Sequence, residues 1–530
     1  MAETIGTILI ASVAPGAITG IGFGSAISGA SFLGVSLATA VGTAAILGTS
    51  IGLNYALRPD VPKPENGSHP LKQGIPPRIR GYGRNRLAGY YMLFEESEKN
   101  SYDVMAVHSG RVAAVVNMYL HDDLVVFDHG ATDAIRPAFA DDGRYGPVGN
   151  VRVNFGYGDG TTQNFFGTGP SGGIWDPATH FGIGIFWASL YCQGQEIKPE
   201  DYTEIYPRGL PVLSLVLDCS PVWDPRDPTQ SRLDSSTWKI SYNPVLQLLD
   251  YLTQGDGCMG LNFDILFPTS AHLAQWMAEA DLCDERVATP GDTEPRYTSN
   301  GWYQFDNKPE DVVNSILATC DGWLAEAGDG SLALKVGVYR EPTVTITANH
   351  IIDFNINYGQ ADEQTVNQLN ISYTDPNSSY VEVQGEPYRD EESISLTGIT
   401  RSQSLDLKWT QTETQARRLA ERAMKRLNAP LSGTITTTLY GLAALGERWV
   451  RVQYPYVSGL QDSVIEIQDA DIDLMAGRIT FTFILVFPEI LEPYDPDAGG
   501  ETPVIPPSIK REDGSSLFHE DGSLYIREDA

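Results

Sequence analysis

The residues whose types could support catalysis are two pairs of nearby carboxylates. Asp122 lies beside Asp123, and Glu382 lies shortly before Glu386. Hydrolysis of a glycan needs two carboxyl groups held about 5–10 Å apart across a sugar-binding cleft. No motif supports either pair, and solvation in a turn or on a strand surface explains both better. The sequence also shows no recognisable arrangement of serine, histidine and aspartate for nucleophilic catalysis, so we predict no catalytic residues.

Cysteine and histidine residues have no spacing that predicts a metal site. The cysteines are odd in number and none forms a C-x-x-C pair, which argues against a disulfide scaffold and a zinc ribbon. The histidines are scattered, without an H-E-x-x-H motif. We therefore expect buried, reduced thiols, with no metal and no cofactor, in a protein assembled in the cytoplasm. The five cysteines are Cys192, Cys219, Cys258, Cys283 and Cys320.

The overall charge restricts the binding partners. The formal net charge of −32 disfavours ordinary binding to the phosphate backbone of DNA, because a duplex repels such a surface. An acidic channel would still let DNA slide past without adsorbing. Charged residues make up 20% of the chain and hydrophobic residues 42%, which is typical of a globular protein. A chain of 530 residues is too long for one ordinary core, so we expect about three or four packed units.

The amino-terminal segment, residues 1–57, contains no Asp, Glu, Lys or Arg from Thr4 to Leu57. A helix of that length would extend about 81 Å, so we expect two apolar helical segments folded back on each other. The break would lie near Gly20–Gly24, where glycines weaken a helix. A secretory signal fits poorly because no basic residue precedes the apolar run. A membrane anchor and a plug buried in a homo-oligomer remain open, and a Pro-rich linker, residues 58–76, follows.

The body reads as three units. Short strand-like runs and a Gly-rich insertion predict a first β-rich domain over residues 77–240. The glycine spacing of Gly156–Gly160 is superficially that of a phosphate-binding loop, but neither Lys-Ser/Thr nor a clear helix start follows, so we expect an insertion loop over 154–175. Three amphipathic helices and a hairpin predict an α+β domain over 241–352. These are 244–252 with Asn243 as N-cap, 270–279, 308–320, and a hairpin of strands 323–326 and 331–338.

Alternating strands and one long helix predict a second β-rich domain over residues 353–490. The helix Thr410–Leu427 carries an apolar stripe opposite Arg417, Arg418, Glu421, Arg422 and Lys425. That basic face could contact nucleic acid, but a solvated or partner-facing helix side is the interpretation we favour. The fold class we predict is α+β and multi-domain, with two β-rich, tube-like domains, a small α+β domain and the apolar helical arm.

The carboxyl-terminal segment, residues 491–530, is rich in Pro and Gly and then repetitive. Arg511, His519 and Arg527 each begin a similar unit in which Glu-Asp is followed by Gly or Ala. Each Asp-Gly favours a turn, and the apolar pair that follows can form a short strand. Two such units cannot bury a core alone. We interpret the segment as a docking tail that adds strands to another protein, with an accidentally repetitive, disordered end as the alternative.

Several strings of the body resemble the tip-attachment, or baseplate-hub, proteins of long-tailed (siphovirus-type) bacteriophages. They cover about residues 75–490 and occur in the order found in that family, which makes the combination more specific than any one string. The strings are PRIRGYGRNRLAG at 77–89, YPRGLP at 206–211 with VWDPR at 222–226, NPVLQLLDYL at 243–252, CDE at 283–285 with EPRYTSNG at 294–301, 367–373 with DP at 375–376, and ARRLA at 416–420.

The resemblance implies a homotrimeric hub at the distal end of the tail in the virion. Two β-domains per chain would form a pseudo-hexameric ring that continues the tail tube, with α+β domains closing it. The implied partners are the distal tail protein, the tape measure protein and tail fibre or tip proteins. The host membrane would be reached through residues 4–57, and DNA would pass through without specific binding. Long relatives continue into receptor-binding regions, so we expect separate fibre proteins to dock on the carboxyl-terminal segment, residues 491–530.

Two other functions compete with the hub. A tail-associated cell-wall glycan hydrolase would need one of the carboxylate pairs described above to act in a cleft. A membrane-anchored surface binding protein would use the apolar arm as its anchor and would be a detergent-dependent monomer. Neither alternative has a supporting motif in the body of the chain.

Overall fold

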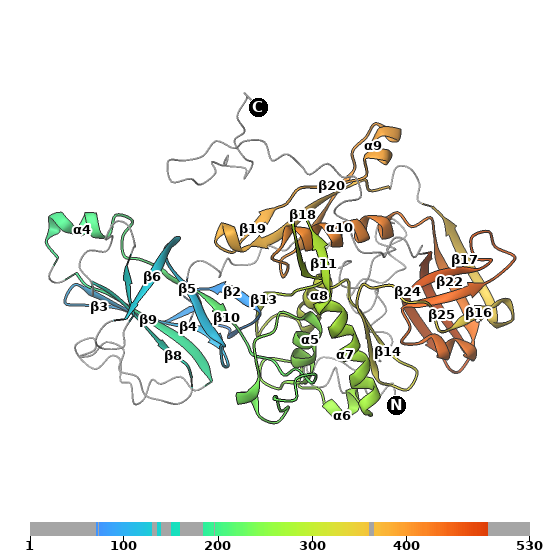
Figure 1. Ribbon diagram of the computed structural model, residues 1–530, viewed down its shortest axis with the longest axis horizontal. Coiled ribbons are helices and arrows are strands. Elements are labelled where there is room, and N and C mark those ends of the chain that lie inside the picture. Colours follow the sequence, from blue (N-terminus) through green and yellow to red (C-terminus); the bar gives the residue numbers. More distant parts are fainter. Residues whose placement is uncertain are drawn as a thin grey trace.

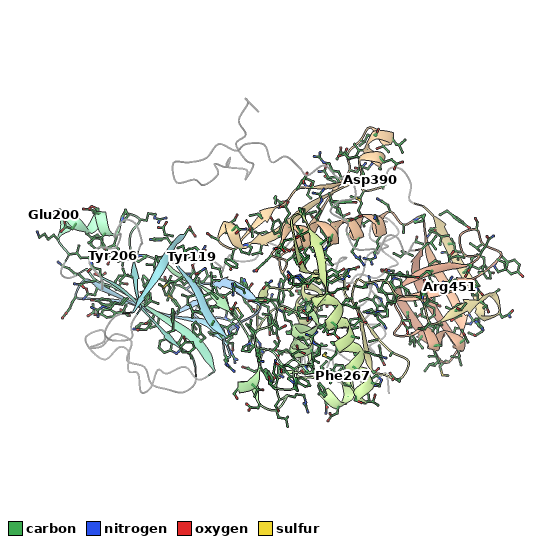
Figure 2. All side chains as sticks on the ribbon, viewed as in Figure 1. Tyr119, Glu200, Tyr206, Phe267, Asp390 and Arg451 are labelled. Carbon is green, nitrogen blue, oxygen red and sulfur yellow. The ribbon has the colours of Figure 1, made fainter. Side chains whose placement is uncertain are left out.

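The structure is a computed structural model that describes residues 70–72, 74–129, 135–138, 150–158, 184–194, 197–359 and 365–485. The apolar arm, most of the linker and the docking tail therefore lie outside the described residues. The described chain is elongated, with a large sheet at one end, helices in the centre and a second sheet at the other end (Figure 1). Figure 2 labels one residue in each region: Tyr119, Phe267 and Arg451.

A nine-stranded antiparallel sheet forms one end, in the order β2-β10-β5-β6-β7-β8-β9-β4-β3. Apolar residues at alternate positions face one core, which includes Leu87, Met105, Met118 and Leu215. The β-rich character predicted for this part of the chain is confirmed. The bounds are β2 Arg84–Leu87, β3 Tyr90–Ser97, β4 Asn100–Ser109, β5 Ala114–Leu120, β6 Asp123–His129, β7 Ile135–Ala138, β8 Val151–Gly156, β9 Ile185–Cys192 and β10 Leu213–Asp218, with helix α4 Pro199–Ile205 before β10.

The central region contains the three predicted helices. Helix α5, Pro244–Thr253, begins as expected, because Asn243 accepts a hydrogen bond from the backbone N–H of Val245 at 3.0 Å. Helix α7 extends to Asp284, past its predicted end, because Ala280 and Cys283 are also buried. The remaining elements are α6 Phe263–Leu266, α8 Pro309–Thr319, and the pairs β1 Ile79–Tyr82 with β13 Gly301–Gln304, β11 Arg286–Thr289 with β12 Asp292–Pro295, and β14 Trp323–Glu326 with β15 Leu332–Lys335.

Helix α10, Glu413–Leu427, packs in the same core as α5, α7 and α8. Its predicted apolar stripe is confirmed, since Ala416, Leu419, Ala420, Ala423, Met424 and Leu427 are all buried. A four-stranded sheet lies against the helix and contributes Leu369, Ile371 and Leu405 to that core. Its strands are β18 Gln368–Asp375, β19 Val381–Gln384, β20 Tyr388–Arg389 and β21 Ser402–Leu407, and helix α9 is Glu391–Thr397.

The other end is a six-stranded sheet in the order β16-β23-β24-β25-β22-β17. It has a separate core, to which Ile435, Ile465, Phe481 and Phe483 contribute. The bounds are β16 Thr345–Thr347, β17 Ile351–Tyr358, β22 Leu431–Thr438, β23 Trp449–Gln453, β24 Ser463–Asp473 and β25 Arg478–Leu485, with the short 3-10 helix η5 at Leu439–Ala444. The prediction of a β-rich, multi-sheet chain with a few helices is therefore confirmed.

Candidate functional site

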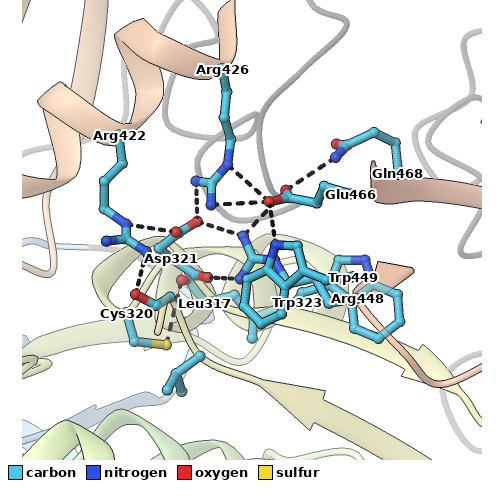
Figure 3. A network of polar contacts seen from close by, with 12 residues as sticks. Leu317, Cys320, Asp321, Trp323, Arg422, Arg426, Arg448, Trp449, Glu466 and Gln468 are labelled. Carbon is cyan, nitrogen blue, oxygen red and sulfur yellow. Dashed lines mark hydrogen bonds and ion pairs between the residues drawn. The ribbon is translucent and has the colours of Figure 1, made fainter. Parts of the chain in front are cut away.

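A cluster of two acids and three arginines lies buried where α10 meets the six-stranded sheet (Figure 3). Asp321 follows α8, Arg422 and Arg426 come from α10, Arg448 immediately precedes β23, and Glu466 lies on β24. Asp321, Arg448 and Glu466 are 0% exposed, and both α10 arginines are almost fully buried. The cluster thus joins the central region to the sheet at one end of the chain.

The two carboxylates share the three guanidinium groups. Asp321 accepts from Arg422 Nε at 2.9 Å through Oδ2, and from Arg426 Nη1 at 2.7 Å through Oδ1. Arg448 Nη2 lies 3.0 Å from Asp321 Oδ1 and 3.4 Å from Glu466 Oε1. Arg426 Nη2 lies 3.2 Å from Glu466 Oε2. Each carboxylate therefore bridges two arginines or more, and charge-assisted bonds of this kind are the strong ones.

The backbone near Asp321 is shaped to place this carboxylate. Asp321 has a φ of 49°, a left-handed conformation uncommon for a residue other than glycine. Its carbonyl oxygen accepts from Arg448 Nη1 at 2.6 Å. A Cβ atom at Gly337 would overlap the Asp321 side chain, so this glycine makes room for the carboxylate. Trp449 also donates from Nε1 to Glu466 Oε2 at 3.2 Å.

The electrostatics of the cluster favour a permanently charged, structural role. Burial alone would lower the pKa of Arg448, but Asp321 and Glu466 raise it above its ordinary value. The pKa of Arg422 is also raised, because Tyr297 and Asp321 outweigh the effect of burial. Groups that stay ionised cannot exchange protons near neutral pH. The cluster can hold two packed regions together, because removing one partner would leave buried charge uncompensated.

The interpretation of the basic face of α10 as solvated or partner-facing is wrong for two of its residues. Arg422 belongs to the buried cluster, and Arg418 is buried against Glu294 and the backbone carbonyl of Arg296. Only the row on the other side of the helix is partly exposed, where Lys425 pairs with Glu421 at 2.7 Å. The physical reason is that three acids from outside the helix compensate arginines next to the apolar stripe. Those acids are Glu294, Asp321 and Glu466.

A second buried polar group joins the central helices to β1, the strand that leads into the nine-stranded sheet. Asp250 on α5 lies 2.7 Å from Arg80 Nη2 and accepts from the Tyr82 hydroxyl at 2.8 Å. Burial raises the pKa of Asp250, an effect opposed by Arg80 and Tyr82. The Cys258 sulfur lies 3.3 Å from the hydroxyl of Tyr303 on β13. This group therefore ties β1 to α5 within the central region, next to the start of the nine-stranded sheet.

The structure does not bring the candidate catalytic carboxylates together in a cleft. Asp122 lies in the turn before β6, as expected for a solvated turn, and Asp123 begins that strand. Glu382 lies on β19, as expected for a strand surface. Each of the four carboxylates forms an ion pair with a nearby cation. The pairs are Asp122 with Arg86, Asp123 with Arg208, Glu382 with Lys408 and Glu386 with Arg417.

One arrangement that the sequence did not reveal centres on His272. Its Nε2 lies 2.8 Å from Asp329 Oδ2, and its Nδ1 lies 2.8 Å from the hydroxyl of Thr269. This order of hydroxyl, imidazole and carboxylate is that of a nucleophilic triad. Here it forms the capping box at the start of α7, in which both side chains satisfy backbone N–H groups. We assign it to helix capping, a role that accounts for the Thr269–His272 spacing.

The thiols and the first glycine of the Gly-rich run have structural explanations. Four of the five cysteines are buried and Cys258 is partly buried, and none forms a disulfide. Burial raises the pKa of Cys219 to about 12, so this thiol stays protonated and unreactive. Gly156 lies in β8, where a Cβ atom would overlap the indole ring of Trp187. Close packing, and not phosphate binding, explains this glycine, while residues 159–183 lie outside the described chain.

Two general features complete the description of the site. Within the described ranges, no group of three or more His, Cys, Asp or Glu side chains could hold a metal ion. Within the same ranges, no helix combines the length and apolar character that crossing a membrane requires.

Comparison with known proteins relates the chain to phage tails. Residues 308–439, from the start of α8 to the end of β22, match a family described as "Putative phage tail protein". No curated protein matches the chain. A chain from the virion of a native gene transfer agent particle has the same fold, with a TM-score of 0.50 and 14% identity. That match covers 90% of this chain and 99% of the other.

Two further solved structures have lower scores, and no argument rests on them. The 43 kDa tail protein of prophage MuSo2 from Shewanella oneidensis is 11% identical, covers 78% of this chain and 99% of its own, and has a TM-score of 0.26. A tail protein from Neisseria meningitidis MC58 is 11% identical, with coverages of 80% and 98% and a TM-score of 0.26. The family match and the shared fold together support a structural role in a phage-type tail.

Proposed function

We propose that the protein is the hub of a bacteriophage tail tip. In this proposal three copies form a ring that continues and closes the tail tube at the distal end of the virion, after assembly in the host cytoplasm. The observation that carries the proposal is the fold shared with a virion chain over 90% of this chain. The match of residues 308–439 to a phage tail family supports it independently of the fold.

The arrangement of the two large sheets suits a ring. Each chain has one large sheet at each end of its long axis (Figure 1), and buried ion pairs fasten the six-stranded sheet to the central region. Three copies would place six sheets around an axis, which is the pseudo-hexameric order that the sequence resemblance implies. Closed cyclic symmetry of this kind is usual among homo-oligomers.

The charge of the chain agrees with a channel for DNA. Three copies would each bring a net charge of −32, and an inner wall of that sign would resist adsorption of DNA. DNA would then pass during ejection without specific binding. The proposed neighbours are the distal tail protein, the tape measure protein and tail fibres, which would dock on residues 491–530.

The apolar arm gives the proposed hub a device for ejection. Three copies of residues 4–57 would bury their apolar side chains against one another, which contributes about 1.5–3 kcal/mol for each large residue. Once the hub opens at the cell surface, the same side chains favour lipid, so the arm would become membrane-active. Particles that lack residues 4–57 should assemble but leak or retain their DNA, and normal infection by such particles would contradict this step.

Stoichiometry in the natural particle tests the proposal directly. Cryo-electron microscopy of particles in which this chain carries a label should place three copies at the adsorbing tip. Native mass measurement of the purified chain should give a trimer of subunits of 57.8 kDa. A single copy per particle, or a label away from the tip, would overturn the hub. A zymogram tests the glycan hydrolase, and detergent-dependent solubility as a monomer tests the membrane-anchored binder.

A further inference from the structure

Among the residues that the structure describes, strand β17 has a neighbouring strand on one side only and so forms an edge of the six-stranded sheet. β17 pairs with β22 on one side only and ends the strand order of its sheet. Asp353 and an irregularity between Ile351 and Asp353 protect the start of the strand, but the part from Phe354 to Tyr358 contains no charged residue and no proline. An edge of this length is a template on which another strand can form backbone hydrogen bonds.

The register shows which backbone groups point outward. Gly359 donates its N–H to the carbonyl oxygen of Pro430 at 2.7 Å, which fixes a hydrogen-bonded pair next to the end of β17. Hydrogen-bonded and non-hydrogen-bonded pairs alternate along an antiparallel ladder. The N–H groups of Phe354, Ile356 and Tyr358 therefore point away from β22. Asp353 accepts from the Phe354 N–H at 2.9 Å, which leaves Ile356 and Tyr358 as the outward donors for an added strand.

The core of the sheet is open at this edge. Phe354 and Tyr358 lie opposite Ile435 and Leu431, which are buried core residues, so their side chains belong to the core face. They are nevertheless 41% and 64% exposed, because the sheet has no further strand beside them. The ring of Phe354 contacts that of Tyr454, which in turn contacts Tyr456, and Tyr456 is 80% exposed. These side chains form an apolar row beside β17. An added strand with apolar residues on one face would cover this row.

The docking tail of this chain has the sequence that fits this edge. Asp521-Gly522 favours a two-residue hairpin turn between Ser516–Glu520 and Ser523–Arg527. With that turn, residues 517 and 526 face each other, as do 519 and 524. One face of the hairpin then carries Leu517, His519, Leu524 and Ile526, and the other carries Phe518 and Tyr525. The first face, with three aliphatic residues, can continue the apolar row of β17. The β17 edge offers unpaired backbone groups and apolar side chains, and the predicted hairpin of the tail could pair with the former and cover the latter.

The segment that leads to the tail also begins close to the β17 edge. β25 ends at Leu485 in the same sheet, and β22 alone separates it from β17. Two strand spacings amount to about 10 Å, a gap that residues 486–515 can bridge many times over. The entropy cost of closing such a loop grows slowly with its length, and a tethered segment has an effective concentration of about millimolar. These magnitudes favour the tail of the same chain over that of another copy.

We propose that the hairpin of residues 516–527 adds to the β17 edge of its own chain and extends the six-stranded sheet. The hairpin covers Phe354 and Tyr358 and accepts the outward N–H groups of Ile356 and Tyr358. The outer strand of the hairpin becomes the new edge of the sheet and is the surface that a fibre protein would meet. The proposal does not depend on the hub function, since a monomer can satisfy it.

Hydrogen exchange of the full chain tests the proposal. The variants are Leu524→Asp, which places a charge on the covered face of the hairpin, and Ser508→Asp, a matched control outside it. We expect the Ile356 and Tyr358 amides to exchange about tenfold faster or more in L524D, with no change in S508D. In the reciprocal variant Tyr358→Pro, the ring removes an outward donor without removing a bond to β22, and the amides of residues 523–527 should lose protection.

Two results would overturn the proposal. One is equal exchange of the Ile356 and Tyr358 amides in the wild-type and L524D chains. The other is protection that increases with protein concentration, because it would place the tail of a second copy on the edge. Y358P changes only β17, and its effect is measured on the amides of residues 523–527. It therefore tests the contact even if L524D prevents the hairpin from forming.

Discussion

Replacing Asp321 by Asn tests whether the buried ion cluster holds the six-stranded sheet against the central region. The substitution keeps the shape of the side chain and removes its charge. Arg422, Arg426 and Arg448 would then have Glu466 as the one acid within the cluster. Asn can still accept from one arginine, but it cannot balance the charge of several in a site that water does not reach.

The expected loss follows from the burial of the cluster. Removing one partner of a fully buried ion pair costs about 3–5 kcal/mol, because the remaining charge is uncompensated. Asp321 contacts three arginines at 2.7–3.0 Å, which places this variant toward the upper part of that range. For a cooperative unit of about 150–250 residues, such a loss lowers the melting temperature by about 10 °C or more.

Differential scanning calorimetry of the full chain can measure this loss. The chain contains several cores, so the transition of the unit that includes the six-stranded sheet must be followed separately. Asp462→Asn is the matched control, since it removes the same charge from an ion pair with Arg451 whose acid is 59% exposed. An exposed pair contributes about 0–1 kcal/mol. If D321N and D462N lose the same stability, the cluster does not hold the sheet.

Three further predictions concern other buried groups. Burial and the nearby Arg80 lower the pKa of His108 to about 4, whereas the unfolded residue titrates near 6.5. Between these two pH values the unfolded state therefore binds more protons than the folded state. The free energy of unfolding should decrease by about 3 kcal/mol as the pH falls from 6.5 to 4. Denaturant titrations of His108→Gln should show a weaker dependence on pH. Gly156→Ala should lose about 1–3 kcal/mol by overlapping Trp187, and tryptophan fluorescence during urea unfolding can measure it. Alkylation of the native protein should modify Cys258 first, because the other thiols are buried, and mass spectrometry of the peptides can check the order.

Elements with local sequence signals could be predicted well. Asn243 followed by Pro244 marks a helix start by side-chain capping and by a fixed φ, and both features are found at α5. The hairpin of β14 and β15 follows from alternating residues around a glycine-containing turn. The apolar stripe of α10 depends only on helical spacing. Each of these patterns acts within about ten residues, so no knowledge of the rest of the chain is needed.

The ion cluster could not be predicted, because its partners are distant in the sequence. Asp321 and Glu466 lie more than a hundred residues apart, and nothing local to α10 identifies them as partners of its arginines. One local feature could have helped. Arg418, Arg422 and Arg426 are spaced by four residues and so form a row beside the apolar stripe, while Arg417 and Lys425 lie on the other side. A row next to the stripe favours burial, and that distinction separates the two groups of cations.

The strength of contacts within the chain bears on how the proposed hub would open. The ion cluster fastens the six-stranded sheet to the central region, and breaking this junction costs about 3–5 kcal/mol. In the proposed hub, the contacts between copies are instead the ones that a conformational change can exchange. Opening of the hub should therefore separate copies from one another while each chain keeps its fold. D321N would loosen the six-stranded sheet within one chain and leave the apolar arm unchanged. The variant can therefore test this expectation. Particles that carry D321N should therefore release their DNA at the same temperature as particles that carry D462N, and a lower release temperature for D321N would place the motion within the chain.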